Sequence, residues 1–153
     1  PHSNGYSLIR RLIADTGASA GTRIGDESLF ERLMTPTRIY VKSLLRLAAA
    51  AEVHAVAHIT GGGLTDNIPR VLPAGLGVRL DPRAWRRDPV WDWIQQGGRI
   101  ADAEMHRTFN CGIGMVVILP GAAVDGALAL LRAANEQATV IGEVVPTEGV
   151  RIG

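Results

Sequence analysis

The chain has 153 residues, of which 46% are hydrophobic and 20% charged, and its formal net charge is +1. This length suits one domain with its own core, so we expect a single domain over residues 1–153. A near-zero net charge gives no reason to expect nucleic acid as a partner. The longest apolar runs are too short to span a membrane, and residues 1–5 lack a signal-peptide pattern, so we expect a cytoplasmic protein. The single cysteine, Cys111, excludes an intrachain disulfide.

The N-terminal segment predicts a helix over residues 6–14. Its apolar residues recur with helical spacing, and Ser3 or Asn4 could cap the helix. Because the chain begins directly at this motif, we expect it to be part of a longer polypeptide. A loop over 15–26 and a short helix over 27–34 are expected next, followed by an amphipathic helix over 38–51.

A glycine loop is the most informative stretch of the chain. The apolar run 53–59 predicts a strand, and it leads into three consecutive glycines, Gly61, Gly62 and Gly63. Glycines let the main chain approach a ligand closely, and helix starts favour anions, so the pattern indicates a site for a phosphorylated small molecule. The spacing matches neither a Walker loop nor a dinucleotide fingerprint. The alternative is a flexible turn that binds nothing.

The residues after the loop predict a helix start. Thr65 or Asp66 could be the N-cap, Pro69 fits the first turn, and Arg70 adds a planar cation suited to phosphate or carboxylate. A strand is expected over 75–80.

All three tryptophans fall in a segment that also contains arginines. Stacking on nucleic-acid bases is one interpretation, but a helix that starts at Pro89 and turns Val90, Trp93 and Ile94 inward is simpler. Gly97 and Gly98 would end that helix.

The last third of the chain predicts two helices and three strands. The helices are expected over 102–107 and 124–135, and the strands over 116–119, 138–145 and 149–152, the last two as an antiparallel pair. Asn110, before the first of these strands, is a plausible ligand amide. The whole pattern predicts an α+β fold in which helices flank a mixed or antiparallel sheet.

No reaction follows from these residues alone. The four histidines lack metal-ligand spacing, so we predict no metal site, and no catalytic set of side chains is evident from spacing. Cys111 has no basic neighbour in sequence to activate it, and a buried structural role is the commoner one.

Four blocks of sequence resemble the C-terminal half of the aminoimidazole ribonucleotide synthetases, also called phosphoribosylformylglycinamidine cyclo-ligases or the PurM family. The blocks are HSNGYSL at 2–8, TPTRIYVK at 35–42, HITGGG through NIPRVLP at 58–73, and RTFNCGIGM at 107–115. Four blocks in the right order make the resemblance specific, and it implies the fold of that family's C-terminal domain.

The resemblance implies an ATP-dependent ring closure in purine biosynthesis. Formylglycinamidine ribonucleotide and ATP would give aminoimidazole ribonucleotide, ADP and phosphate, through phosphorylation of the formamide oxygen and attack by an amidine nitrogen. The family is a homodimer that holds ATP and Mg²⁺ largely on an N-terminal domain absent from this chain. This fragment alone is therefore expected to be inactive.

Only substrate-side roles transfer to this chain. The resemblance implies polar contacts to the substrate from His2, Ser3 and Asn4, a loop beside it at Gly61–Gly63, and a further amide at Asn110. Asn67 and Arg70 are added to this set, and the catalytic residues stay unassigned. These loops are expected to converge on one side of the domain.

Two other classes of function stay open. A sibling enzyme of the superfamily, such as a formylglycinamidine ribonucleotide synthetase, selenophosphate synthetase or thiamine-phosphate kinase, would share the fold and the use of ATP. A non-catalytic binding or dimerisation module is the second.

Overall fold

The computed structural model describes residues 1–2 and 4–153 and divides into two compact units. The helical unit comprises Pro1–Thr37, Ile59–Asn67 and Arg86–Gly114, and the sheet unit comprises Arg38–His58, Ile68–Trp85 and Met115–Gly153. The units alternate along the chain, so each is assembled from three separated segments.

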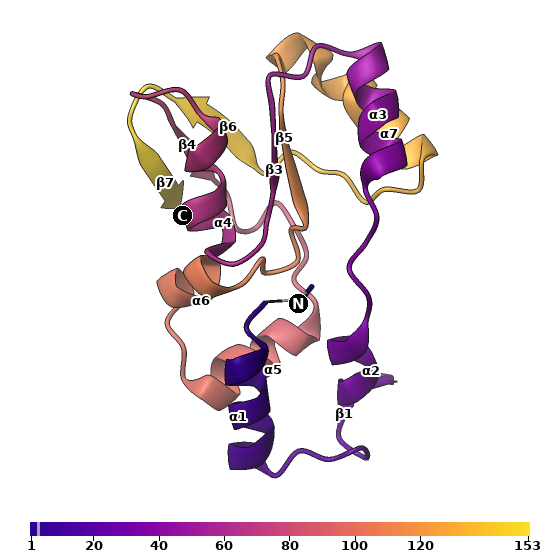
Figure 1. Cartoon of the computed structure of the whole chain (residues 1–153), viewed down its shortest axis with the longest axis vertical. Coiled ribbons are helices and arrows are strands. Elements are labelled where there is room, and N and C mark those ends of the chain that lie inside the picture. The colour runs from indigo at the N-terminus through magenta and orange to yellow at the C-terminus, as the bar shows by residue number, and fades with distance from the viewer. Residues whose placement is uncertain (3) are drawn as a thin grey trace. The chain divides into compact units, whose positions relative to one another are not determined.

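The helical unit contains five helices and one short hairpin within its described residues (Figure 1). Its elements are α1 (Tyr6–Thr16), β1 (Arg23–Ile24), β2 (Glu27–Ser28), α2 (Leu29–Met34), α4 (Gly63–Asn67), α5 (Pro89–Gly98) and α6 (Asp102–Thr108). The hairpin of β1 and β2 was not predicted, since two-residue strands leave no alternating pattern to detect. At α2, Ser28 accepts a hydrogen bond from the N–H of Phe30 and the Glu31 side chain accepts one from the N–H of Ser28, which fixes the helix start.

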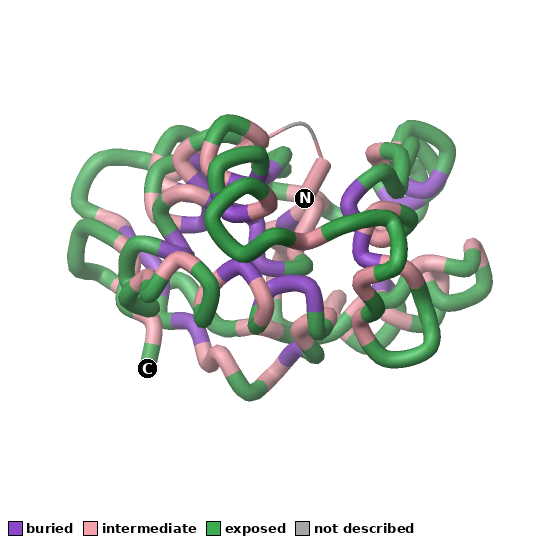
Figure 2. The backbone as a smooth tube through the Cα atoms, turned by 90° about the horizontal axis from the view of Figure 1, so that it is seen from below, coloured by how far each residue is buried: buried purple, intermediate pink, exposed green. Residues whose placement is uncertain are grey.

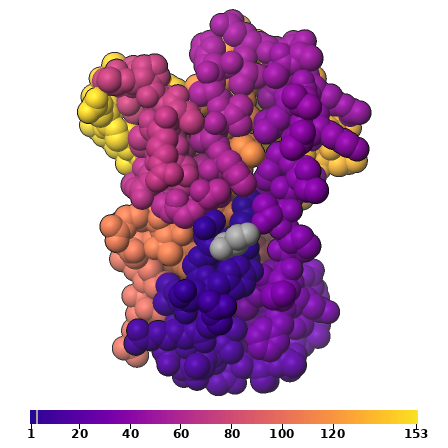
Figure 3. Space-filling view, viewed as in Figure 1, coloured from indigo at the N-terminus to yellow at the C-terminus, as the bar shows by residue number. Residues whose placement is uncertain are grey.

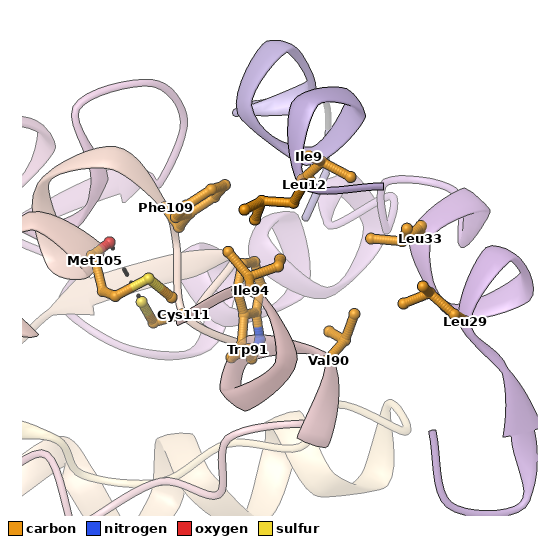
Figure 4. Packing of buried hydrophobic residues seen from close by; sticks show 10 residues of the cluster. All are labelled: Ile9, Leu12, Leu29, Leu33, Val90, Trp91, Ile94, Met105, Phe109 and Cys111. Atoms are coloured by element: carbon orange, nitrogen blue, oxygen red, sulfur yellow. Dashed lines mark hydrogen bonds between the residues drawn. The ribbon is translucent and has the colours of Figure 1, made fainter. Parts of the chain in front are cut away.

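One buried cluster holds the helical unit together (Figure 4). α1, α2, α5 and α6 all contribute to it, and the segment after α6 adds the last two side chains. Its members are Ile9, Leu12, Leu29, Leu33, Val90, Trp91, Ile94, Met105, Phe109 and Cys111. The rings of Trp91 and Phe109 lie 5.5 Å apart between centroids. Helical spacing of apolar side chains therefore becomes a shared core.

The prediction for α5 was right in its start and in its inward residues, and it missed the buried Trp91. Asp88 caps the helix by accepting from the N–H of Val90, and Pro89 is its first residue. Val90, Trp91 and Ile94 are buried, whereas Trp93 is half-buried at the edge of the core. The inward face of α5 thus includes position 91 and leaves Trp93 at its margin.

The sheet unit contains two small sheets and two α-helices of ten residues each. Its elements are α3 (Val41–Ala50), β3 (Ala55–His58), η1 (Pro69–Val71), β4 (Gly77–Leu80), β5 (Met115–Ile118), η2 (Gly121–Ala123), α7 (Val124–Ala133), β6 (Gly142–Val145) and β7 (Gly149–Ile152). α3 and α7 pack against each other (Figure 1). In the smaller sheet, β3 pairs with β5 in antiparallel fashion, with Ala55 opposite Ile118.

The larger sheet corrects the predicted hairpin of the last two strands. Its order is β6-β4-β7, with β4 antiparallel to β6 and parallel to β7. The two C-terminal strands therefore flank β4 and do not pair with each other. Gly77 explains the tight fit on one side of β4, because a Cβ there would lie 2.8 Å from the backbone nitrogen of Gly149 and closer still to two carbonyl oxygens.

Two predicted helix starts are also corrected. The N-cap of α1 is Gly5, in a left-handed conformation and without a side-chain cap, so Asn4 does not cap the helix; Ser3 lies outside the described residues. α4 begins at Gly63, which places Thr65 and Asp66 inside the helix and not at its cap. Pro69 begins a separate 3-10 turn, η1.

The predicted α+β class, with mixed and antiparallel sheets and flanking helices, is confirmed. Exposed stretches recur along the whole described chain (Figure 2). Among the described residues, no helix has both the length and the apolar character needed to cross a bilayer.

Candidate functional site

A pocket of about 400 Å³ lies entirely within the helical unit. Residues from the N-terminus, the glycine loop, α4 and α6 line it: Asn4, Gly5, Gly61, Gly62, Asp66, Glu104, Arg107 and Thr108. In Figure 3 the N-terminal residues in indigo and the orange residues of α6 share the visible face. Three segments far apart in sequence therefore meet around one polar hollow.

The glycine loop is fixed by close packing against the end of α6. Gly63 has φ 56, and a Cβ at this residue would lie 2.6 Å from the carbonyl oxygen of Phe109 and closer still to that of His106. No side chain fits there, and a positive φ is itself costly for any other residue. Thr65 adds a hydrogen bond from its hydroxyl to the carbonyl of His106, at 3.4 Å. α4 and α6 are thus held together by main-chain contact.

Asn67 holds the loop from behind. Its side-chain N–H₂ donates to the carbonyl oxygens of Thr60, Gly61 and Gly63 at 3.3, 3.1 and 2.8 Å, and its Oδ1 accepts from the Thr60 hydroxyl at 3.3 Å. Only 6% of Asn67 is exposed. Its buried amide therefore ties three carbonyls of the loop to the end of α4.

The N-terminus reaches the same pocket because Gly5 allows a close approach. Gly5 has φ 74, and a Cβ there would lie 2.8 Å from Cδ1 of Phe109 and closer still to Cε1. The preceding Asn4 side chain then lies over the loop, with its Oδ1 3.3 Å from the position that a Cβ on Gly61 would take. The lack of a side chain at Gly5 therefore lets the segment that carries Asn4 lie directly against the buried Phe109 ring.

One wall of the pocket is a charged network on α6. Arg107 donates from Nε and Nη2 to the two carboxylate oxygens of Glu104, at 3.0 and 3.2 Å. The Thr108 hydroxyl donates to Oε1 of Glu104 at 2.9 Å. This side-on pairing engages both carboxylate oxygens of Glu104.

Comparison with known proteins agrees with the four sequence blocks. The model of the family "AIR synthase related protein, C-terminal domain" matches residues 1–153. The chain belongs to this family. A phosphoribosylformylglycinamidine cyclo-ligase of Nitrosococcus oceani is 48% identical to it over 154 residues, which is 99% of this chain and 43% of that relative. The chain thus spans less than half the length of this relative.

Within this AIR-synthase-related domain, the structure brings together some of the predicted site residues. Asn4, Gly61 and Gly62 line the pocket, whereas Gly63 and Asn67 are buried behind the loop. Their contact with a substrate stays a prediction.

The other predicted residues that the structure describes are not among those that line the pocket. Asn110 is buried, and its Oδ1 accepts from the N–H of Gly112 at 3.4 Å, so its amide shapes the turn after α6. His2 is half-buried with φ 55, and Ser3 lies outside the described residues. Arg70 belongs to the sheet unit, where it is exposed in η1.

Sequence reasoning missed four side chains of the pocket. Asp66 was considered only as a helix cap, and Glu104, Arg107 and Thr108 were not singled out. Their spacing of three and four residues does predict neighbouring positions on one helical face. It does not tell which face meets the glycine loop, since that depends on the packing of Gly63.

The chain has two further side chains with reactive groups, Cys111 and His106. Both are buried, and neither is among the residues that line the pocket. Burial raises the pKa of the Cys111 thiol to about 11, and its Sγ donates to the carbonyl of Met105 at 3.4 Å (Figure 4). A thiol that stays protonated is a poor nucleophile. Burial, with a smaller contribution from Arg87, lowers the pKa of His106. Among residues 1–2 and 4–153, no three potential metal ligands come together.

Proposed function

We propose that this chain acts as the C-terminal, substrate-side domain of an ATP-dependent cyclo-ligase. The reaction would convert formylglycinamidine ribonucleotide to aminoimidazole ribonucleotide, a step of purine biosynthesis. The single observation that carries the proposal is the 48% identity to a phosphoribosylformylglycinamidine cyclo-ligase over 99% of the chain.

The geometry of the helical unit supports a binding role for its pocket. Asn4 offers an amide from the N-terminal segment, and Gly61 and Gly62 offer bare backbone on a loop that is held by Asn67 and by the packing of Gly63. A rigid polar pocket can hold a flexible substrate with its reacting atoms close together, which lowers the entropic part of the barrier to ring closure. Ring closure within one molecule depends strongly on such positioning.

ATP and Mg²⁺ are proposed to bind mainly through the part of the enzyme that this chain does not match. ATP would supply the phosphoryl group that activates the formyl oxygen. The residues described here offer no cluster of three metal ligands, so we assign no Mg²⁺ ligand to them. A homodimer in the cytoplasm is the assembly and location that we propose for the whole enzyme.

The test is an assay of the full natural polypeptide that carries this chain. We expect ADP release and aminoimidazole ribonucleotide formation from authentic formylglycinamidine ribonucleotide and MgATP. The 153-residue chain alone, assayed in parallel, is expected to give neither product.

A folded, ATP-binding polypeptide that gives no product would overturn the substrate assignment. The same preparation would then be assayed with selenide, with thiamine phosphate, and with formylglycinamide ribonucleotide plus glutamine. Turnover of one of these would identify a sibling enzyme, and turnover of none would leave a binding module.

A further inference from the structure

The two carboxylates that line the pocket differ in their pairing. Glu104 is neutralised locally by Arg107 and also accepts from Thr108. Asp66, by contrast, takes part in no ion pair or side-chain hydrogen bond with any residue that the structure describes. Two negative charges and one positive charge line the pocket, and Asp66 carries the excess negative charge.

The negative charge of Asp66 lies against the glycine loop. A Cβ on Gly62, which has φ 96, would lie 2.6 Å from the Cβ of Asp66 and 2.8 Å from its Oδ2. The Asp66 carboxylate therefore occupies the space that a side chain at position 62 would need. It is exposed and borders the same hollow as Asn4.

This charge does not suit the phosphate expected from the sequence. A phosphate in the pocket would face an uncompensated carboxylate, and like charges at short range repel. Among the lining residues that the structure describes, Arg107 is the only arginine, and it is already engaged with Glu104. α4 has five residues, too few to contribute a substantial helix dipole. The pocket is therefore better matched to a group that is cationic and donates hydrogen bonds.

The substrate of the proposed function contains one such group. The relative's name describes a phosphoribosyl, a formyl and a glycinamidine group. The phosphate is anionic and the formyl group is neutral. An amidine is a strong base that carries a proton at neutral pH, and its planar N–H groups match a carboxylate as a guanidinium does.

We propose that Asp66 binds the amidine of the substrate, beside the glycine loop. The inference rests on the proposed function and assigns one end of the substrate to this pocket. Asp66 accepts N–H hydrogen bonds from the amidine, and Asn4 supplies a neutral polar contact nearby. The amidine that must reach the formyl carbon is thereby held in place, while the phosphate lies outside this pocket.

The experiment compares two ligands in two proteins. The ligands are formylglycinamidine ribonucleotide and formylglycinamide ribonucleotide, in which a neutral C=O replaces the amidine C=NH. Their dissociation constants are measured by calorimetry with the full natural polypeptide and with Asp66→Asn. Asp125→Asn makes the same change of charge at an exposed position on α7, away from the pocket lining, and serves as the matched control.

We expect the wild-type protein and Asp125→Asn to bind the amidine ligand more tightly than the amide ligand. Asp66→Asn should weaken the amidine ligand by roughly 10-fold or more, the usual range for losing a charged hydrogen-bond partner, and leave the amide ligand nearly unchanged. The KM for ATP should not change. Circular dichroism and the melting temperature check that Asp66→Asn is folded.

Equal loss for both ligands would overturn the inference, because it would mean that Asp66 contacts a part that they share. Tighter inhibition of Asp66→Asn than of the wild-type protein by ribose 5-phosphate would also overturn the inference. It would mean that the phosphate binds in this pocket. These results are distinct from failure of the proposed function, in which the wild-type polypeptide neither binds nor converts the amidine ligand.

Discussion

The two units differ in how completely they bury their apolar side chains. The helical unit encloses a cluster of ten buried residues and carries the pocket. The sheet unit contains six of the seven large hydrophobic residues that are exposed in the described chain: Ile39, Val41, Leu45, Val56, Val140 and Val144. The pocket therefore belongs to the better-packed unit, where a buried core supports its backbone. Truncating an exposed apolar side chain of the sheet unit should therefore cost much less free energy of unfolding than truncating a member of the buried cluster of the helical unit.

The largest effect is expected for Phe109→Ala. The Phe109 ring is fully buried, contacts Trp91 and limits the approach of Gly5. Its removal should lower the free energy of unfolding by about 3–5 kcal/mol through lost burial and the cavity left behind. Urea unfolding followed by circular dichroism measures this loss. A loss below about 1 kcal/mol would mean that the cluster does not support the pocket as described.

Two glycine-to-alanine substitutions, one in each unit, should change the free energy of unfolding in opposite directions. Gly63→Ala places a methyl group against two carbonyl oxygens at φ 56, so it should destabilise the protein by about 1–3 kcal/mol or more. Gly126, inside α7 of the sheet unit, has no neighbour within 4 Å of its Cβ position. Gly126→Ala should stabilise by up to about 1 kcal/mol, because alanine favours the helix. Thermal melts of both variants test this expectation. A change of the melting temperature in the same direction for both variants would refute it.

His106 should make stability depend on pH. Desolvation, and to a smaller extent Arg87, lower its pKa in the folded state. The unfolded chain, with an ordinary pKa near 6.5, then binds more protons as the pH falls, so the free energy of unfolding should decrease below about pH 7. One group accounts for at most about 1.4 kcal/mol per pH unit. His106→Gln should flatten this part of the curve in urea titrations from pH 7.5 to 5; parallel curves would contradict the assignment.

Sequence patterns predicted what is local and missed what depends on packing. The helix that starts at Pro89 could be predicted from its own capping residues. The glycine loop and the segment at Asn4 could be predicted as site segments from short motifs. The wall of the pocket could not, because Glu104 and Arg107 reach it only through the contact of Gly63 with the end of α6.

The β6-β4-β7 order was missed for a similar reason. A short connection between two apolar segments favours a hairpin, and nothing in the sequence indicates that β4 comes between them. The sequence likewise predicted that the glycine loop binds an anion, because nothing in the sequence shows that the Asp66 carboxylate lies against Gly62.

The smallest effect should come from the exposed face of α3 in the sheet unit. Leu45 is 67% exposed, whereas Leu47, two residues further along the same helix, is fully buried. Leu45→Ala should change the free energy of unfolding by no more than about 0.5 kcal/mol, and Leu47→Ala should lower it by about 2–5 kcal/mol. Both variants are measured by urea unfolding of the same chain. Because helix propensity changes equally in the pair, the difference between them isolates burial. A loss above about 1 kcal/mol for Leu45→Ala would mean that this side chain is covered in solution, and the contrast between the units would then weaken.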